Sequence, residues 1–470
     1  MPIGALVWGA AAVLVSHRWL LWLHPLDWVG VPLPLSMPLC LLLWLLCGLL
    51  GGLLVASWAW LVRRLDPARP GTALLAAALW GLAEVALARG PLFWIGLGSA
   101  PLPGDPALAG LARLGGVGLV AAAQLLVGWC LWWTTAARGA GRSPPIAAGL
   151  ALLVSLVLAL HLVGLQQLHA ASDRIGASNA EEVQLLVLQP AIPTRRKFAP
   201  DQQRLLLNRL ATAQRLAEAQ RFAASGDSTS PVLVLPEGAL ALGQGVPLAV
   251  PVEVLAGGFR LEGDSLRSSL LRLAPASGDG TPQAVSGWVD KHRLVPLGEA
   301  VPFGGLLRWS GLSAVGGVEP GMPSRVLQRP EGPIGIALCY EIADGVALAD
   351  AARSGAGWLL ASANLDPYPA SLHHQFTTLA RLRALETGRW LVSAANTGPS
   401  LVVDPAARIQ PGSPPAFAPA TASLQLRPSL EPTPYLRLGE RPLLLLLAAG
   451  AALRLAERWK RHLTASAVRM

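Results

Sequence analysis

The feature that most constrains this chain is a series of long apolar runs in its first third. Residues 39–62 form 24 consecutive positions without a charged side chain, and about 20 apolar residues are enough to cross a bilayer as a helix. Four further runs approach that length, at residues 3–23, 72–89, 112–134 and 146–168. Inside lipid, only helices and closed barrels satisfy their backbone hydrogen bonds. The sequence therefore predicts a multi-span helical membrane domain over residues 1–170.

Two of these runs contain polar residues. His17 and Arg18 interrupt the first run, and Glu84 lies in the third, where a carboxylate is costly unless it is paired or hydrated. The first run starts close to Met1 without a basic segment or a small-residue cleavage site. We therefore expect it to be an anchor and not a cleaved signal peptide.

The composition of the whole chain agrees with a membrane protein. Hydrophobic residues make up 53% and charged residues 14%, whereas soluble proteins carry roughly 25% charged residues. An ordinary soluble enzyme and a disordered chain are both excluded on this ground. The net charge of +9 does not indicate a nucleic-acid partner, because several basic residues lie in short clusters between apolar runs.

These basic clusters predict how the chain crosses the membrane. Five arginines lie in the two loops that follow the second and fourth runs: Arg63, Arg64, Arg69, Arg138 and Arg142. Loops rich in Arg and Lys stay in the cytoplasm. The loop at 90–112 has neither residue type and is expected outside. Residues 172–435 then lie on the external side as well.

A last apolar run, at 442–453, is followed by a basic tail. Its 12 residues are short for a span, unless Arg441 and Arg454 reach towards the two interfaces. The alternative is a helix that lies in the membrane surface. We predict a C-terminal membrane helix and a basic cytoplasmic tail over residues 440–470.

Residues 172–435 alternate between short apolar segments and helical patterns. Buried strands are predicted at 183–189, 232–236, 334–338, 357–361, 390–395 and 401–403. Apolar spacing predicts helices at 205–223 and 376–386, and a Pro-rich stretch at 411–419 predicts a loop. Strands and helices in this order predict an α/β or α+β sandwich.

Three polar residues, Glu237, Lys291 and Cys339, lie just beyond predicted strands. Side chains at strand ends converge on a site in α/β folds. A thiol needs a base such as a carboxylate before it attacks a carbonyl, and an ammonium stabilises the oxyanion that forms. Together the three residues predict an acyl-transfer site. Each one alone has a simpler explanation, as a loop Glu, a surface Lys and a buried Cys.

The scarcity of lysine and cysteine bears on these residues. Three of the 37 basic residues are lysines, so Lys291 indicates that a compact, titratable amine is needed. Lys197, in an Arg-Arg-Lys run, is expected to face lipid headgroups. Cys339 is the only one of four cysteines outside the apolar runs, which leaves no disulfide framework. The histidines lack metal-ligand spacing, so no metal is expected, and the glycines at 115–118 predict close helix packing.

Three segments resemble the catalytic motifs of the carbon–nitrogen hydrolase (nitrilase) superfamily. They are Leu-Pro-Glu-Gly at 235–238, Asp-Lys-His-Arg-Leu-Val-Pro-Leu-Gly-Glu at 290–299 and Leu-Cys-Tyr-Glu-Ile at 338–342. The long middle motif, together with Cys-Tyr-Glu, resembles the apolipoprotein N-acyltransferase family in particular. Further segments agree, at 83–90, 106–110, 188–198, 380–389 and 396–398, so the resemblance covers roughly residues 20–460.

The resemblance implies a role for each residue of the three motifs. Glu237 is the general base, Lys291 donates to the oxyanion and Cys339 is the nucleophile. The backbone N–H of Tyr340 completes the oxyanion hole, and Glu299 positions the lysine.

Two other residues have a less specific role in this resemblance. Glu341 matches a residue that supports the site, although a salt bridge at a strand end explains it equally well. Phe198 falls where the family often has Trp at the lip of the site, and we expect it either to touch acyl chains or to pack.

The resemblance also implies a fold, a location and a reaction. The fold is an αββα sandwich beside a helical membrane domain, on the periplasmic side of the bacterial cytoplasmic (inner) membrane. A phospholipid, usually phosphatidylethanolamine, donates an acyl chain to the cysteine as a thioester. The N-terminal amine of the diacylglyceryl-Cys of an apolipoprotein then accepts it. No cofactor and no nucleic acid are implied.

The chain departs from the family pattern in places. It begins near the family's third span, which predicts either a short variant or a start codon placed too late. The family's Asn-Asp-Ala-Trp-Phe run appears as Asn-Leu-Asp-Pro-Tyr at 364–368, and its Gln-His pair as Gln-Phe at 375–376. These changes affect the expected substrate loops and leave Glu237, Lys291 and Cys339 in place.

Two other functions remain open at this point. One is a membrane-anchored nitrilase-type amidase that uses water as the acceptor and hydrolyses a C–N bond. The other is a non-enzymatic membrane protein with a degenerate domain. Five or more spans argue against the amidase, because a soluble amide needs no such platform. The intact Glu, Lys and Cys argue against the non-enzymatic protein.

Overall fold

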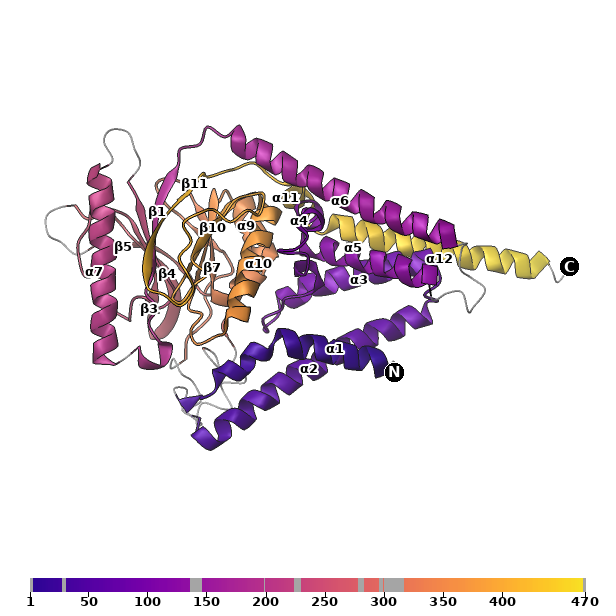
Figure 1. The fold of residues 1–470 in the computed structure, drawn as a ribbon, viewed down its shortest axis with the longest axis horizontal. Helices are drawn as coiled ribbons and strands as arrows, with labels where there is room; N and C mark the ends of the chain where they lie inside the picture. The colour runs from indigo at the N-terminus through magenta and orange to yellow at the C-terminus, as the bar shows by residue number, and fades with distance from the viewer. Residues whose placement is uncertain are drawn as a thin grey trace.

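The computed structural model describes residues 3–27, 31–135, 146–197, 199–223, 230–277, 283–295, 299 and 317–467. Two stacked β-sheets lie at one end of the molecule, and long helices extend away from them (Figure 1). Both ends of the chain lie at the far end of these helices. The molecule therefore has a helical part and an α/β part, as the sequence predicts.

The helical part consists of the long apolar helices expected from the sequence. Their bounds are α1 Ile3–Ser16, α2 Leu33–Arg64, α3 Pro70–Ala88, α5 Ala112–Thr135, α6 Ile146–Gly176 and α12 Arg441–Ala467. Within the described part of the chain, α2, α3, α5 and α6 are long and apolar enough to cross a membrane. Four of the expected spans are thereby confirmed as helices of sufficient length.

The first helix is shorter than predicted. α1 ends at Ser16, and the polar pair His17 and Arg18 leads into a 3₁₀ turn, η1 Arg18–Leu23. His17 is nevertheless buried, and its Nε2 lies 3.0 Å from the carbonyl oxygen of Phe93. The interruption noted in the sequence therefore ends the helix and ties the next turn to a distant loop.

The last helix is longer than the predicted run of 12 residues. α12 has 27 residues and runs beside α3 and α5 instead of across their ends (Figure 1). Gly450 lies so close to α3 that an added Cβ would be 2.6 Å from the backbone nitrogen of Leu75. Among the described helices, however, α12 is not one of those apolar enough over 18 residues to cross a membrane, so the C-terminal membrane helix stays a prediction.

Small residues let α3 and α5 approach each other closely. A Cβ added to Gly118 would lie 2.7 Å from the carbonyl oxygen of Gly81 and 2.8 Å from Leu443 of α12. The predicted packing role of the glycines at 115–118 is thus confirmed. They also bend α5, since Gly116 has a φ of +67°, which favours glycine.

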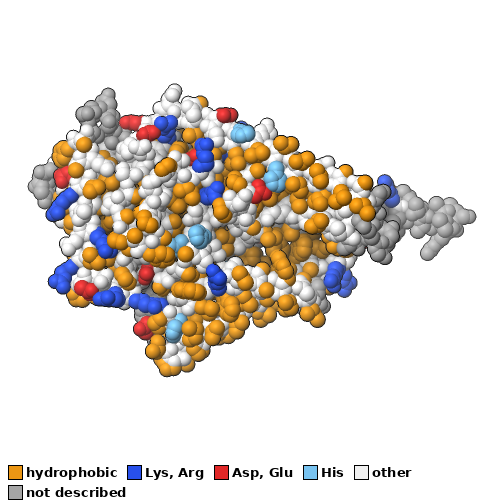
Figure 2. All heavy atoms as spheres, in the orientation of Figure 1, with side chains coloured by type: hydrophobic (Ala, Val, Ile, Leu, Met, Phe, Trp, Pro, Cys, Tyr) orange, Lys and Arg blue, Asp and Glu red, His pale blue; other side chains and the backbone are white. Residues whose placement is uncertain are grey.

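The outer faces of the helices are apolar. In α6 only 6% of the most apolar stretch is buried inside the protein, against 56% in α3. Leu150, Leu158 and Leu162 of α6 are exposed, and Figure 2 shows hydrophobic side chains across α1, α2 and α6. A water-soluble protein rarely exposes apolar surface on this scale, so these faces indicate a membrane protein.

Glu84 is fully paired inside the helical part. Its carboxylate accepts hydrogen bonds from Trp80 Nε1 at 2.8 Å and from the backbone nitrogens of Leu97 and Gly98 at 2.7 and 3.0 Å. The sequence does not show how a carboxylate is tolerated in a membrane helix. In the structure, three hydrogen-bond donors stabilise it. The same bonds fix the loop that follows α3.

The α/β part is built from two sheets that lie face to face. The first has strand order β11-β1-β2-β3-β4-β5, and the second has order β10-β9-β8-β7-β6. The strands of the first sheet are β1 Val183–Gln189, β2 Val232–Leu235, β3 Val254–Glu262, β4 Ser265–Leu273, β5 Val285–Asp290 and β11 Ala420–Leu426. Those of the second are β6 Val326–Leu327, β7 Ile334–Leu338, β8 Trp358–Ala363, β9 Trp390–Ala395 and β10 Leu401–Val403.

Helices cover both outer faces of the sheets. Helix α7 Pro200–Ala223 covers the first sheet, and α9 Gly345–Arg353 and α10 Ala370–Thr387 cover the second, on the side of the membrane helices (Figure 1). Leu185 and Val234 of the first sheet share an apolar core with Ile336 and Leu360 of the second. The expected αββα sandwich is therefore confirmed.

The sandwich and the helical part share one apolar core. Phe376 and Leu382 of α10 belong to the same buried cluster as Leu111 and Val120 near the start of α5. Where α5 bends, the freed backbone nitrogen of Val117 donates to Glu386 Oε1 at 2.8 Å. The bend in α5 thus provides a contact between the membrane helices and the α/β part.

Candidate active site

Cys339 follows strand β7 directly. It opens a short 3₁₀ helix, η7 Cys339–Ala343, and its φ of +53° lies in the left-handed region that non-glycine residues seldom adopt. Strained residues of this kind cluster at functional sites, because the surrounding fold has to hold them. The turn places the thiol at the end of an inner strand of the second sheet.

Glu237 comes from the other sheet, just after β2. Gly257 of the neighbouring strand β3 leaves no room for a side chain, since an added Cβ would collide with the Cα of Glu237. The Glu237 Oε2 atom accepts the backbone N–H of Asn364 at 3.0 Å. Both the backbone and the carboxylate of Glu237 are therefore fixed in place.

Lys291 follows β5 and joins two carboxylates. Its Nζ donates to Glu237 Oε1 and to Glu299 Oε1, each at 2.7 Å, and its side chain is 1% exposed. Burial alone would lower the pKa of Lys291, but the charges of Glu237 and Glu299 outweigh it and hold the pKa well above its usual value. Lys291 is therefore a buried ammonium.

The Cys339 thiol lies close enough to the Glu237 carboxylate to be affected by its charge. Burial, and next the charge of Glu237, raises the pKa of Cys339 well above its usual value, although Lys291 opposes this shift. The thiol accordingly rests in its protonated form. A nucleophilic attack from this state requires a base, and Glu237 is adjacent.

Glu299 completes the charged group. Burial raises the pKa of Glu299, Lys291 opposes this effect, and Glu237 adds to it as a like charge. The second oxygen, Oε2, accepts the backbone N–H of Val295 at 2.9 Å. One ammonium thus lies between two carboxylates, and both contact it at 2.7 Å.

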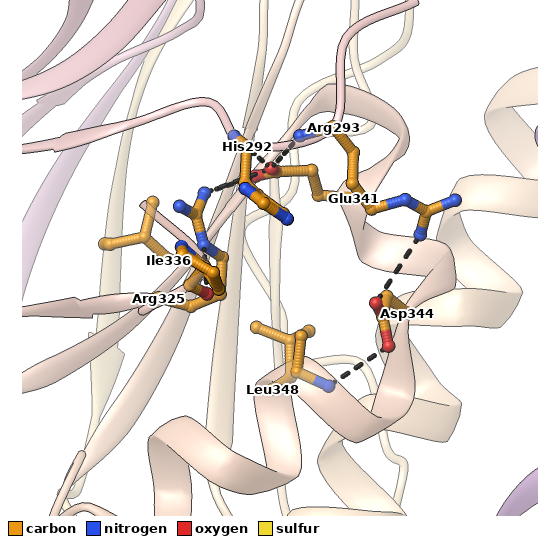
Figure 3. A pocket seen from close by; sticks show the side chains of 9 residues that line it. His292, Arg293, Arg325, Ile336, Glu341, Asp344 and Leu348 are labelled. Carbon is orange, nitrogen blue, oxygen red and sulfur yellow. Dashed lines mark hydrogen bonds and ion pairs between the residues drawn. The ribbon is translucent and has the colours of Figure 1, made fainter. Parts of the chain in front are cut away.

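Glu341 links the loop of Lys291 to the strand of Cys339 (Figure 3). Its Oε1 accepts the backbone N–H groups of His292 at 2.8 Å and Arg293 at 3.0 Å, and its Oε2 accepts that of Leu338 at 2.9 Å. Arg325 Nη1 lies 3.0 Å from both oxygens. The salt bridge considered in the sequence is therefore present, and the role of Glu341 as a support of the site stays a prediction.

Tyr340 packs beside the charged group. Its hydroxyl donates to the carbonyl oxygen of Leu294 at 2.6 Å, and the Lys291 Nζ lies 5.9 Å from the centre of its ring. Burial raises the pKa of Tyr340 to about 12, so the hydroxyl stays neutral near pH 7. The side chain therefore holds the loop after Lys291.

Arg293 connects this loop to the membrane part. Its Nη1 donates to the carbonyl oxygen of Ala88 at 2.7 Å, at the end of α3, and its Nη2 donates to that of Gly90. The guanidinium also lies 3.7 Å from Asp344. A hollow of about 250 Å³ between these groups is lined by His292, Arg325 and Ile336 (Figure 3). Cys339 does not line it.

Lys197 is where a sequence interpretation is wrong. It was expected to face lipid headgroups, but its Nζ turns inward and donates to the carbonyl oxygen of Gly238, the residue after Glu237. Lys197 and Glu237 line one hollow of about 260 Å³. The scarcity of lysine, which drew attention to Lys291, was equally a signal for Lys197.

Other contacts of the site were missing from the sequence interpretation. Arg325 and Asn364 lie outside the three motifs. Arg293 lies inside the middle motif, but the sequence does not indicate its contact partners. Phe198 lies outside the described residues, so its expected place at the lip of the site stays a prediction.

The stacked sheets and the residues at their strand ends define a class, the carbon–nitrogen hydrolase superfamily. Residues 278–432 match the carbon-nitrogen hydrolase family. Among solved structures, the chain is similar to an amidase from Nesterenkonia sp., with 18% identity, a TM-score of 0.37 and coverage of 56% of this chain and 95% of that one. A carbon-nitrogen hydrolase from Helicobacter pylori has 15% identity and a TM-score of 0.37, covering 57% and 95%.

Curated relatives define the family within this class. An apolipoprotein N-acyltransferase from Prochlorococcus marinus is 46% identical, over 86% of this chain and 78% of the relative. One from Parasynechococcus marenigrum is 44% identical, over 93% and 89%, and one from Nostoc sp. is 29% identical, over 86% and 79%. The chain belongs to the apolipoprotein N-acyltransferase family.

Proposed function

We propose that this protein moves a fatty acyl chain from a membrane phospholipid, through a thioester on Cys339, to the N-terminal amine of the diacylglyceryl-Cys of apolipoproteins. The observation that carries the proposal is the buried Lys291 ammonium. Its Nζ lies 2.7 Å from an oxygen of Glu237 and from one of Glu299, and it interacts electrostatically with Cys339. Family membership supports the choice of substrates.

In the first half-reaction the Cys339 sulfur attacks an ester carbonyl of the phospholipid. Glu237 accepts the thiol proton as the C–S bond forms, and Lys291 stabilises the oxyanion together with the backbone N–H of Tyr340. The C–O bond of the ester then breaks, and Glu237 returns the proton to the leaving oxygen. Lysophospholipid leaves, and the acyl group remains on sulfur.

In the second half-reaction the α-amine of the apolipoprotein attacks the thioester. The C–N bond forms, the C–S bond breaks, and the proton released by the amine passes through Glu237 to the sulfur. The thiol of Cys339 is regenerated, so the cycle is a ping-pong transfer without net oxidation or reduction. Glu299 and Glu341 act by positioning Lys291 and the loop that carries it.

The division of labour follows the two parts of the molecule. Residues 172–435 carry the chemistry, and residues 1–170 and 440–470 hold this domain at the membrane, where both lipid substrates are available laterally. The usual donor of the family, phosphatidylethanolamine, is our proposed donor here. Phe198 is proposed to contact the acyl chain.

We further propose that the α/β part lies on the periplasmic side of the inner membrane. Arg69, in the loop between α2 and α3, lies 3.9 Å from Glu457 of α12, and Arg454 pairs with the same carboxylate at 2.6 Å. The basic ends of three helices thus meet at one end of the bundle, far from the sheets, which supports a cytoplasmic location for that end. Arg138 and Arg142 lie outside the described residues.

A reconstituted assay tests the transfer. Purified protein is mixed with phosphatidylethanolamine and a synthetic diacylated lipopeptide, and mass spectrometry follows the lipopeptide and the enzyme. We expect a third acyl chain on the lipopeptide and, with phospholipid alone, an acyl adduct on Cys339. Free fatty acid with an unmodified lipopeptide would contradict the transfer, because water and not the amine would then be the acceptor.

A labelling experiment tests the orientation. Single cysteines replace Asp264, at the exposed tip of the β3–β4 hairpin, or Arg64, at the exposed end of α2, in a chain without its native cysteines. An impermeant thiol reagent added to intact spheroplasts is expected to label only the Asp264→Cys protein. Labelling of the Arg64→Cys protein alone would reverse the proposed topology.

A further inference from the structure

The short basic run before α7 divides into two outward residues and one inward residue. Arg195 is exposed and donates to the carbonyl oxygen of His24 at 2.7 Å, and Arg196 is exposed and pairs with Asp201 at 2.9 Å. Lys197 points the other way, onto Gly238. A charge that only served solubility or lipid headgroups would not be directed into the protein beside a reactive carboxylate.

The contact of Lys197 with the Glu237 turn is tight. Gly238 has a φ of +69°, and a Cβ added there would lie 2.7 Å from the Lys197 Nζ. The ammonium therefore occupies the space that a side chain at this position would need. Since Gly238 immediately follows Glu237, the hydrogen bond to its carbonyl oxygen fixes the backbone that carries the general base.

Lys197 also interacts electrostatically with Glu237. Burial lowers the pKa of Lys197, and the charge of Glu237 is what opposes this shift. Among the described residues, Glu237 also faces the Lys291 ammonium, the Glu299 carboxylate, the Cys339 thiol, the Tyr368 hydroxyl and the backbone N–H of Asn364. The Glu237–Gly238 turn thus receives one ammonium on its backbone, from Lys197, and another on its carboxylate, from Lys291.

We propose that Lys197 is a positioning residue, which fixes the Glu237–Gly238 turn and so holds the Glu237 carboxylate where it accepts the thiol proton. This inference rests on the proposed function, since it assigns Lys197 a part in the first half-reaction. Arginine is a poor substitute, because its planar, larger head does not fit the space above Gly238. A lysine is therefore retained in a chain that otherwise uses arginine.

The test is the rate of lysophospholipid release in a single turnover, measured for full-length protein in detergent micelles that contain phosphatidylethanolamine. Lys197→Met keeps the length of the side chain and removes the donor to the Gly238 carbonyl oxygen. Misplacement of a catalytic group by about 1 Å can cost roughly 10² in rate. We therefore expect a loss of about 10- to 100-fold.

Arg196→Met is the matched control, since it removes the neighbouring charge from an exposed site, and its rate is expected to equal that of the wild type. Lys197→Gln retains a donor for the Gly238 carbonyl, so it is expected to recover most of the rate that Lys197→Met loses. Equal losses in the two Lys197 variants, or no loss in either, would overturn the proposal. If wild-type protein releases no lysophospholipid, the proposed function itself fails, which is a different result.

Discussion

The helical part and the active site both bury charged groups, but they treat them differently. Glu84 in the helical part receives three neutral donors and is left with nothing reactive nearby. In the active site, Lys291 is shared between Glu237 and Glu299, and the thiol of Cys339 lies against the same carboxylate. Hydrogen bonds from neutral donors stabilise the fold around the Glu84 carboxylate. Opposite charges held beside a thiol are instead typical of a reactive site.

The two regions also differ in how they are packed. The membrane helices meet through glycines, so a single added methyl group disturbs them, while the sandwich has a thick core of Leu, Val and Ile. Substitutions in the site should therefore abolish chemistry without unfolding the protein. Substitutions at the helix contacts should weaken the fold without changing the chemistry of each folded molecule.

The largest effect is expected from Cys339→Ala. Removal of the covalent nucleophile should reduce transfer to below about 10⁻⁴ of the wild-type rate, because no other group forms the thioester. Thermal unfolding should stay close to that of the wild type, since Ala keeps the Cβ and removes only the sulfur atom. Transfer is measured by mass of the triacylated lipopeptide. Wild-type-like turnover in this variant would remove Cys339 from the mechanism.

Glu237→Gln should follow, with a loss of roughly 10²–10⁴ near pH 7, the usual contribution of a general base. Gln cannot accept the thiol proton. Because the pKa of Cys339 is raised well above its usual value, the thiolate forms only as the pH rises, and part of the rate should return. Single-turnover release of lysophospholipid from pH 6 to 10 measures this. A flat profile would mean that Glu237 only orders Lys291.

Lys291→Arg should cost roughly 10²–10³, similar to the loss of one oxyanion donor. The charge is kept, but a planar guanidinium cannot place one N–H group between Glu237 and the oxyanion in a site that buries Lys291 to 1% exposure. The measurement is the rate of thioester formation on Cys339. Activity within about tenfold of wild type would make the residue an electrostatic bystander.

The smallest effect on catalysis, and the clearest one on folding, is expected from Gly118→Leu. Its side chain would enter the contact with Gly81 and Leu443, and overpacking of this kind costs about 1–3 kcal/mol. Gly128→Leu is the control on the same helix, because a Cβ at Gly128 meets nothing within 4 Å. We expect only Gly118→Leu to lower the thermal unfolding temperature. Equal stability of both variants would show that the helices do not need this contact.

Strands β3 and β4 were not predicted from the sequence, and their charged residues explain why. β3 and β4 contain Arg260 and Arg272, which interrupt the apolar pattern by which the other strands were found. In the structure Arg260 pairs with Asp290 of β5 at 2.7 Å, and Arg272 pairs with the buried Glu253. Each charge is neutralised by a residue from another segment, and a local pattern does not reveal its partner.

The sequence by itself determined the parts that depend on neighbouring residues. Runs of apolar side chains make the membrane helices whatever they pack against, and short apolar segments that end in Glu237 and Cys339 make buried strands with reactive ends. The motif around Lys291 identified the third residue of the predicted site. These features are local, so the chain displays them before it folds.

Only the tertiary structure decided which groups meet. The inward turn of Lys197, the clamp of Glu341 on two loops and the docking of Glu386 on the bend of α5 join residues that are 41, 48, 49 and 269 positions apart. Such contacts arise because most buried polar groups need a hydrogen-bond partner, and the available partner is set by how the sheets and helices pack. The sequence supplies the groups, and the packing of distant segments gives each one its neighbour.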